Sequence, residues 1–128
     1  MIVGIDFDGT VVKHAYPLVG EEVDKAVMVM KKLVSHGHQL ILYTMRSDES
    51  LLDAEKWFED RSIPLYGVNN NPSQRRWTNS IKVYAHVYID DAALGCPLLE
   101  GGKMERPFVD WDSVDKLLEQ RGFYSAEQ

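Results

Sequence analysis

The stretch Ile2-Val3-Gly4-Ile5-Asp6-Phe7-Asp8-Gly9-Thr10 decides how the rest of the chain is interpreted. Its first part is a short apolar run, which is typical of a buried strand in a parallel sheet. Two carboxylates, Asp6 and Asp8, follow where this strand should end. Ligands of open α/β sheets bind beyond the carboxyl ends of the strands. Because two such close carboxylates repel each other, they predict a hard divalent cation between them; the alternative is that both are solvated turn residues.

Length and composition limit the possible classes of protein. The 128 residues predict one domain, spanning 1–128, with a single core, and 45% hydrophobic and 27% charged residues are globular values. A net charge of −6 argues against nucleic acid as a partner, because nucleic-acid affinity comes mainly from Lys and Arg contacts with phosphates. It is compatible with a small phosphorylated substrate, which needs only local positive charge.

Cysteine content and hydropathy indicate the compartment. The single cysteine, Cys96, cannot form an internal disulfide and fits a reducing compartment as a small buried residue. No apolar run is long enough for a membrane span, and the chain starts in a predicted strand instead of a leader. We therefore expect no membrane partner and a cytoplasmic location.

Apolar runs alternate with helical patterns along the chain, which predicts βαβ units around a parallel sheet. The expected fold class is α/β, a Rossmann-like three-layer α/β/α sandwich with a mostly parallel central sheet. Strands are predicted at 2–7, 39–43, 65–68 and 85–89. Helices are predicted over 21–36, from 48 or 49 to 61, and from about 110 to 121, with a further short helix left open within 74–82.

Details of two predicted helices can be compared with the structure. The first should carry Glu21, Glu22 and Asp24 in its first turn, where the helix dipole favours acids. The last should turn Val114, Leu117 and Leu118 inward, and the stretch between residues 92 and 109 should be irregular.

Other polar side chains also lie at the predicted strand ends. Thr44 follows the second strand, Asp90 and Asp91 follow the fourth, and Lys82 precedes the fourth. Since the carboxyl ends of parallel strands share one edge, residues far apart in sequence meet there. Phosphoryl transfer needs these types: a carboxylate nucleophile, a proton donor, and positive charge around the phosphoryl oxygens. A cation held by the aspartates would screen the nucleophile from the anionic phosphate.

These residues resemble the haloacid dehalogenase-like hydrolase superfamily, most of whose members are magnesium-dependent phosphatases. The resemblance covers roughly residues 1–96, and its motifs are Asp-Phe-Asp-Gly-Thr at 6–10, the strand and threonine at 40–44, a lone Lys82, and Tyr-Ile-Asp-Asp at 88–91. It implies that Asp6 is the nucleophile that forms an aspartyl-phosphate. It implies that Asp8 is first the general acid and then the base, which favours phosphate esters over carbon–halogen bonds.

The resemblance also implies a cofactor and binding residues. Mg²⁺ would be held by Asp6, by the backbone carbonyl of Asp8 and by Asp90, with Asp91 as a further ligand or as support for the ligands. Thr44 and Lys82 would hold the phosphate. Arg75 or Arg76 could supply this charge instead of Lys82, and Arg46 and Arg76 are candidate substrate contacts. His14 is interpreted as a solvated loop residue.

Members of this superfamily usually carry a cap domain over the site. The segments 11–20 and 45–81 are too short to hold one, so the resemblance implies a capless member with an open site. Such a site would accept a large substrate or would be completed by a neighbouring subunit, which makes a homo-oligomer a possible partner.

Three alternatives to a small-molecule phosphatase stay open. A phospho-acceptor signalling module also uses Asp, Thr, Lys and magnesium, but its motifs come in another order. A metal-binding module without activity is the second alternative. A polynucleotide end-phosphatase is a variant that an open site favours and the negative net charge disfavours.

Overall fold

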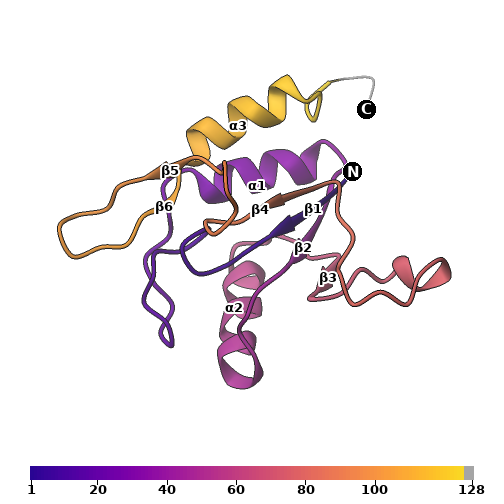
Figure 1. Cartoon of the computed structure of the whole chain (residues 1–128), viewed down its shortest axis with the longest axis horizontal. Helices are drawn as coiled ribbons and strands as arrows, with labels where there is room; N and C mark the ends of the chain where they lie inside the picture. The colour runs from indigo at the N-terminus through magenta and orange to yellow at the C-terminus, as the bar shows by residue number, and fades with distance from the viewer. Residues whose placement is uncertain (126–128) are drawn as a thin grey trace.

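A parallel four-stranded sheet forms the centre of the fold. The computed structural model describes residues 1–125. The strand order is β3-β2-β1-β4, and all pairs in this sheet are parallel (Figure 1). The register aligns Ile5 with Leu42 and Ile89. The strands are β1 (Ile2–Ile5), β2 (Gln39–Leu42), β3 (Gly67–Val68) and β4 (Val87–Ile89), each shorter than predicted. The predicted α/β, Rossmann-like class with a parallel sheet is confirmed.

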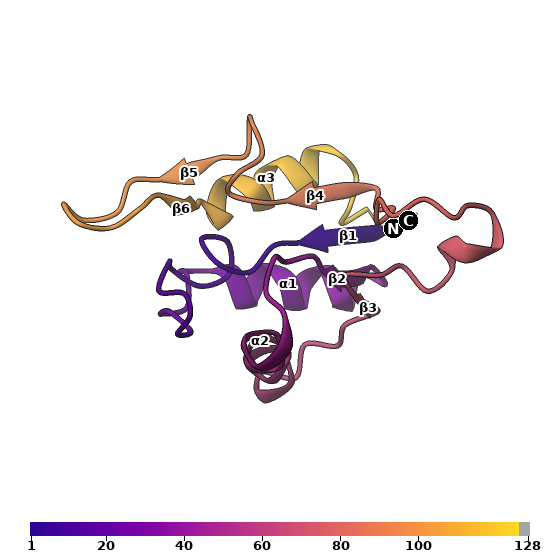
Figure 2. The same ribbon diagram turned by 60° about the horizontal axis from the view of Figure 1, so that its bottom comes forward.

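Three helices share one core with one face of the sheet. They are α1 (Ala26–Ser35), α2 (Asp48–Asp60) and α3 (Trp111–Gln120). Val3 and Ile5 of β1 project to this face together with Leu40, Leu42 and Ile89, because alternate strand residues share a face, and all five belong to the core that the helices complete. Figure 1 shows α1 and α3 side by side, and in the turned view of Figure 2 β1 and β4 cross the picture between them. Lys32 of α1 forms an ion pair of 3.3 Å with Asp115 of α3.

The segment 69–85 packs against part of the opposite face of the sheet. A Cβ on Gly4 would contact the ring of Tyr88 and the side chain of Ala85 on this face. A Cβ on Gly67 would collide with the backbone oxygen of Asn70. The segment contains one short 3₁₀ turn, η1 (Gln74–Arg76), within the stretch 74–82 where the sequence allowed a short helix without deciding for it. The third layer is therefore an irregular segment in close contact with the strands, in contrast to the three-helix layer.

The first helix begins later than predicted. The helix expected over 21–36 starts at Ala26, and none of the expected acids lies in its first turn. The reason is that the preceding residues continue an extended pairing: Val12 bridges Glu22, and the Val23 N–H donates to the Val11 carbonyl at 2.9 Å. These bonds hold the chain extended until Lys25, which has a left-handed φ of 68°.

The expectation of an irregular stretch between 92 and 109 is wrong in part. A small antiparallel hairpin forms there from β5 (Leu98–Leu99) and β6 (Phe108–Val109). The Val109 N–H donates to the Gly9 carbonyl at 3.0 Å, and the indole of Trp111 donates to the Thr10 carbonyl at 2.7 Å. These two bonds place the hairpin beside the loop that follows β1.

The last helix begins where the sequence predicts. The Asp110 side chain accepts the Ser113 N–H at 3.2 Å, as an N-cap does. Val114 and Leu118 are buried, but Leu117 is 44% exposed, so its predicted inward position is wrong. The inward positions follow Trp111 at intervals of three and four, and Leu117 lies beside this stripe. Within residues 1–125, none of the helices has the length and apolarity needed to cross a membrane.

Candidate metal and phosphate site

Three carboxylates meet at the carboxyl edge of the sheet. Asp6 follows β1, and Asp90 and Asp91 follow β4; one oxygen from each lies within 4.8 Å of the others. The Asp6 N–H donates to the Ile89 carbonyl at 3.0 Å, which continues the strand pairing to this point. The three face an open cavity of about 530 Å³, whose other lining residues are Asp8, His14, Tyr16, Thr44, Met45, Arg46, Ala92 and Arg106. The sequence-predicted aspartates are thus brought together.

The electrostatics of this cluster favour a cation. Burial, and next the negative charge of Asp90, raise the pKa of Asp6 to about 8, although the Thr10 hydroxyl donates to its Oδ2 at 3.0 Å. Burial also raises the pKa of Asp90. Three converging carboxylates in a partly buried place are the hard oxygen donors that Mg²⁺ takes. The residues present therefore fit the cation that the resemblance implies.

Thr10 and Gly9 join the two strand ends. The buried Thr10 hydroxyl donates to Asp6 and accepts the Asp91 N–H at 3.1 Å. Gly9 has a φ of 82°, and a side chain there would collide with the ring of His14 and the carboxylate of Asp91. His14 Nε2 lies 3.0 Å from Asp91 Oδ2, and its side chain is only 16% exposed. The interpretation of His14 as a solvated loop residue is therefore wrong.

A buried arginine holds the carboxylate of Asp8. Arg46 Nε and Nη2 donate to the two Asp8 oxygens at 2.7 Å each, a bidentate pair. The other N–H groups of Arg46 donate to the carbonyls of Pro17, Leu18 and Ser50, and its side chain is 1% exposed. A guanidinium has five N–H donors, and all are used here. Arg46 therefore positions Asp8 and has no donor for a substrate, which corrects its predicted role.

Thr44 lines the cavity, but the predicted phosphate-binding cations Lys82, Arg75 and Arg76 do not. The Thr44 N–H donates to Asn69 Oδ1 at 2.8 Å, and its hydroxyl oxygen accepts the Arg46 N–H at 3.1 Å. Lys82 lines another cavity, with its Nζ 5.9 Å from the centre of the Tyr88 ring. Arg76 is exposed and lines neither of these cavities. The structure does not bring Lys82 or Arg76 to the aspartates.

A solved structure of a conserved protein coded by a locus from Bacteroides thetaiotaomicron is similar to this chain. The two share 31% sequence identity over 94% of this chain and 91% of that chain, with a TM-score of 0.79. The chain belongs to that protein's family. No protein-family model matches the chain, and no curated protein matches it. Membership of this family fixes the fold and names no activity, so a function has to be argued from the site.

Sequence reasoning missed one charged residue of the site altogether. Arg106, from the connection between β5 and β6, lines the cavity of the aspartates. Its side chain has no hydrogen-bond or ion-pair partner in the described part of the chain. No pattern in the stretch 100–107 indicates this role, because it depends on the hairpin that carries Arg106 back toward Gly9. Of the two arginines that line the cavity, Arg46 has all its donors in use, and Arg106 has its side-chain donors available within the described part of the chain.

Proposed function

We propose that the protein is a magnesium-dependent phosphoric monoester hydrolase that forms an aspartyl-phosphate on Asp6. The observation that carries the proposal is the meeting of Asp6, Asp90 and Asp91 oxygens within 4.8 Å in one open cavity that Asp8 and Thr44 also line. A nucleophilic carboxylate, a second carboxylate for proton transfer and a hydroxyl donor are the groups that phosphoryl transfer requires.

Two carboxylates share the covalent chemistry. An oxygen of Asp6 forms a bond to phosphorus while the bond from phosphorus to the ester oxygen breaks, and that oxygen leaves with a proton from Asp8. In the second step Asp8 takes a proton from water, the water oxygen bonds to phosphorus, and the acyl phosphate bond to Asp6 breaks. Asp8 ends the cycle protonated again, and inorganic phosphate is released.

Other groups hold the phosphate and orient the acid. The Mg²⁺ ion would be held by Asp6, Asp90 and Asp91 with the Asp8 carbonyl, and it supplies charge neutralisation and polarisation of the phosphoryl oxygens. The Thr44 hydroxyl and the Arg106 guanidinium donate to those oxygens. Arg46 orients the Asp8 carboxylate at one side of the cavity through its bidentate pair. When Asp8 carries its proton as the acid, the protonated oxygen gives up its bond from Arg46 and the other oxygen keeps its own.

The first test is hydrolysis of 4-nitrophenyl phosphate with magnesium and with a chelator. We expect turnover that needs magnesium and falls by roughly 10⁴-fold or more in Asp6→Asn, because the nucleophile is lost. Asp24→Asn is the matched control, since Asp24 is exposed and lies outside the cavity. Turnover that persists in Asp6→Asn would overturn the proposal. Phosphate that stays bound to Asp6 without release would support the phospho-acceptor module instead.

The source of the phosphate-binding charge has its own test. We expect Arg106→Gln to raise KM for the aryl phosphate about tenfold or more, because a charge-assisted hydrogen bond is lost. Lys82→Gln should leave KM unchanged, since Lys82 lies over Tyr88 at another cavity. The reverse pattern, with KM changed by Lys82→Gln alone, would assign the charge to Lys82.

A further inference from the structure

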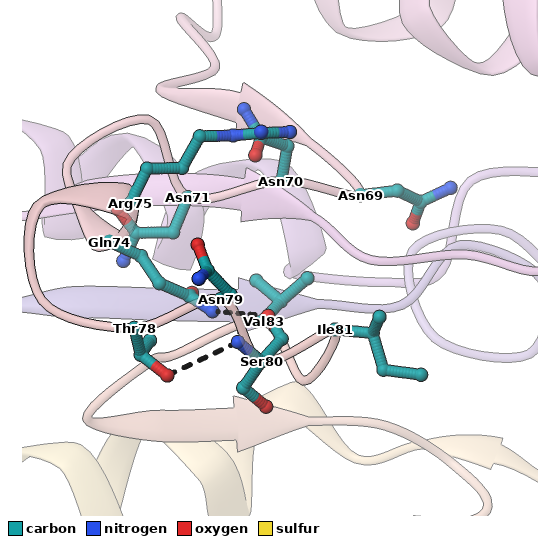
Figure 3. A pocket seen from close by; sticks show the side chains of 10 residues that line it. All are labelled: Asn69, Asn70, Asn71, Gln74, Arg75, Thr78, Asn79, Ser80, Ile81 and Val83. Carbon is teal, nitrogen blue, oxygen red and sulfur yellow. Dashed lines mark hydrogen bonds between the residues drawn. The ribbon is translucent and has the colours of Figure 1, made fainter.

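A second cavity lies in an acid-free part of the molecule. Residues 61–89 contain four cations and no Asp or Glu, although the chain has 20 acidic residues and a net charge of −6. Within this stretch, residues 69–83 enclose a cavity of about 370 Å³, and no carboxylate is among its lining side chains (Figure 3). Its charge is therefore opposite to that of the aspartate cavity.

Buried amides fix the shape of this cavity. The Gln74 amide donates to the carbonyls of Ser80 at 3.0 Å and Lys82 at 2.8 Å, and its oxygen accepts the Tyr84 N–H at 2.8 Å. The Asn71 amide donates to the Tyr84 carbonyl at 3.0 Å. Gln74 and Asn71 are both buried. The cavity is thus held by internal hydrogen bonds and is formed before any ligand arrives.

Hydrogen-bond donors without partners line the same cavity. The side chains of Asn70, Arg75 and Asn79 are exposed, and within residues 1–125 they form no hydrogen bond or ion pair. Figure 3 shows Arg75 extending in the direction of Asn70 along the cavity. A guanidinium binds phosphate or carboxylate through paired N–H groups, and amide NH₂ groups add donors. This donor set, with no acid to neutralise it, is suited to an anion.

The two cavities share a wall. Thr44 lines the aspartate cavity, Asn69 lines the second one, and the Thr44 N–H donates to Asn69 Oδ1 at 2.8 Å. An anionic group would be repelled by the aspartates unless a cation is bound there, whereas the Arg75 cavity attracts it. We propose that the cavity of Asn70, Arg75 and Asn79 binds a second anionic group of the substrate, a phosphate or a carboxylate. This assignment of the substrate class rests on the proposed phosphatase function.

Binding of inorganic phosphate tests the cavity without any turnover. The ¹⁵N-labelled protein is titrated with phosphate in the presence of a chelator, and the side-chain signals of Asn70, Arg75 and Asn79 are followed by NMR. We expect these signals to shift together and to saturate. Arg75→Gln should weaken the affinity about tenfold or more, and the neighbouring Arg76→Gln, outside the cavity, should not. The absence of saturable shifts at these side chains, or equal weakening in both variants, would overturn the proposal.

Kinetics then link the cavity to the substrate. Alkanediol bisphosphates of increasing chain length are compared with the matching monophosphates and with phosphorylated hydroxy acids, which separates a second phosphate from a carboxylate. We expect at least one doubly anionic series to have the higher kcat/KM, and Arg75→Gln to remove this advantage while the monophosphate is unaffected. An equal loss for both substrate types would overturn the link. No magnesium-dependent turnover of any ester would instead contradict the proposed function, and the phosphate titration would still decide the cavity.

Discussion

The cavities on the two sides of the Thr44–Asn69 hydrogen bond satisfy their polar groups in opposite ways. The aspartate cavity is assembled from several segments, and its carboxylates face one another across a few ångströms. The cavity of residues 69–83 comes from one segment, and its buried amides, Asn71 and Gln74, are hydrogen-bonded to the backbone of that segment. The comparison therefore sets partly buried carboxylates that lie close to one another against buried amides whose hydrogen bonds are made.

This difference indicates what each region contributes to stability. Hydrogen-bonded buried amides stabilise the loop that they connect, because removing them leaves backbone groups unpaired. Partly buried carboxylates with raised pKa values, such as Asp6 and Asp90, cost folding free energy, and such groups are concentrated at functional sites. The aspartate cavity is held in place by the surrounding sheet and core, and its stability should depend on pH and on a cation.

The largest expected effect is the pH dependence of stability in a chelator. The pKa of Asp6 is raised to about 8 from its usual 3.8. Between these values the folded protein holds a proton that the unfolded chain has lost, so the free energy of unfolding falls as the pH rises. The total is several kcal/mol, since one pKa unit corresponds to about 1.4 kcal/mol. Denaturant unfolding at a series of pH values measures it.

The control for this prediction is Asp6→Asn, which keeps the shape of the side chain and has no titrating group. We expect the variant to lose most of the decline between about pH 4 and pH 8. Magnesium should also remove the decline in the wild-type protein, because it stabilises the ionised carboxylates. An identical decline in the wild type and in Asp6→Asn would show that Asp6 does not cause the pH dependence, and the proposed difference between the two cavities would be wrong.

The sequence predicts the strand-end residues of the aspartate cavity better than the loop residues that surround them. Asp6, Thr44, Asp90 and Asp91 each lie at the end of a predicted strand, and the parallel sheet alone brings strand ends to one edge. The Asp8–Arg46 pair and the site position of Arg106 depend on how loops fold back, and no periodic pattern encodes those paths. This is why Arg46 was expected to contact a substrate and Lys82 to lie in the cavity.

The sequence also predicts the regular elements of the fold better than the paths of its loops. Apolar periodicity predicted the helices α1, α2 and α3, and short apolar runs predicted the strands of the parallel sheet. The periodicity places the start of α1 too early. Val23 is buried in the extended pairing that it forms with Val11, and an apolar residue at this position fits the inward face of a helix equally well. The periodicity also missed the hairpin of β5 and β6, whose strands have two residues each.

Removing Arg46 should give the next largest effect. Arg46→Ala leaves the Asp8 carboxylate and the carbonyls of Leu18 and Ser50 without their donors, in a place where the arginine is 3% exposed. We expect the free energy of unfolding to fall by about 3–5 kcal/mol, as when one partner of a buried pair is removed. Arg46→Lys should restore only part of it, because Lys lacks the bidentate geometry. A loss below about 1 kcal/mol, the value of an exposed ion pair, would show that this pair is not held as a buried one.

The smallest of the three effects is expected in the second cavity, at Gln74. Gln74→Ala removes both donors and the acceptor that connect the backbone at Ser80, Lys82 and Tyr84. Each buried group left unpaired costs about 1–3 kcal/mol. Ser80, Lys82 and Tyr84 are all exposed, so water can replace part of these bonds, and a total loss of about 2 kcal/mol in the free energy of unfolding is expected.

Asn79→Ala is the matched control, because Asn79 lines the same cavity and is exposed without a side-chain partner in the described chain. Its unfolding free energy should stay within about 0.5 kcal/mol of the wild type. Since neither variant changes a charge, both should keep the pH dependence that Asp6 causes, whereas Asp6→Asn alone should lose it. A Gln74→Ala variant as stable as Asn79→Ala would mean that the amides do not hold the loop, and the second cavity would then need its ligand in order to form.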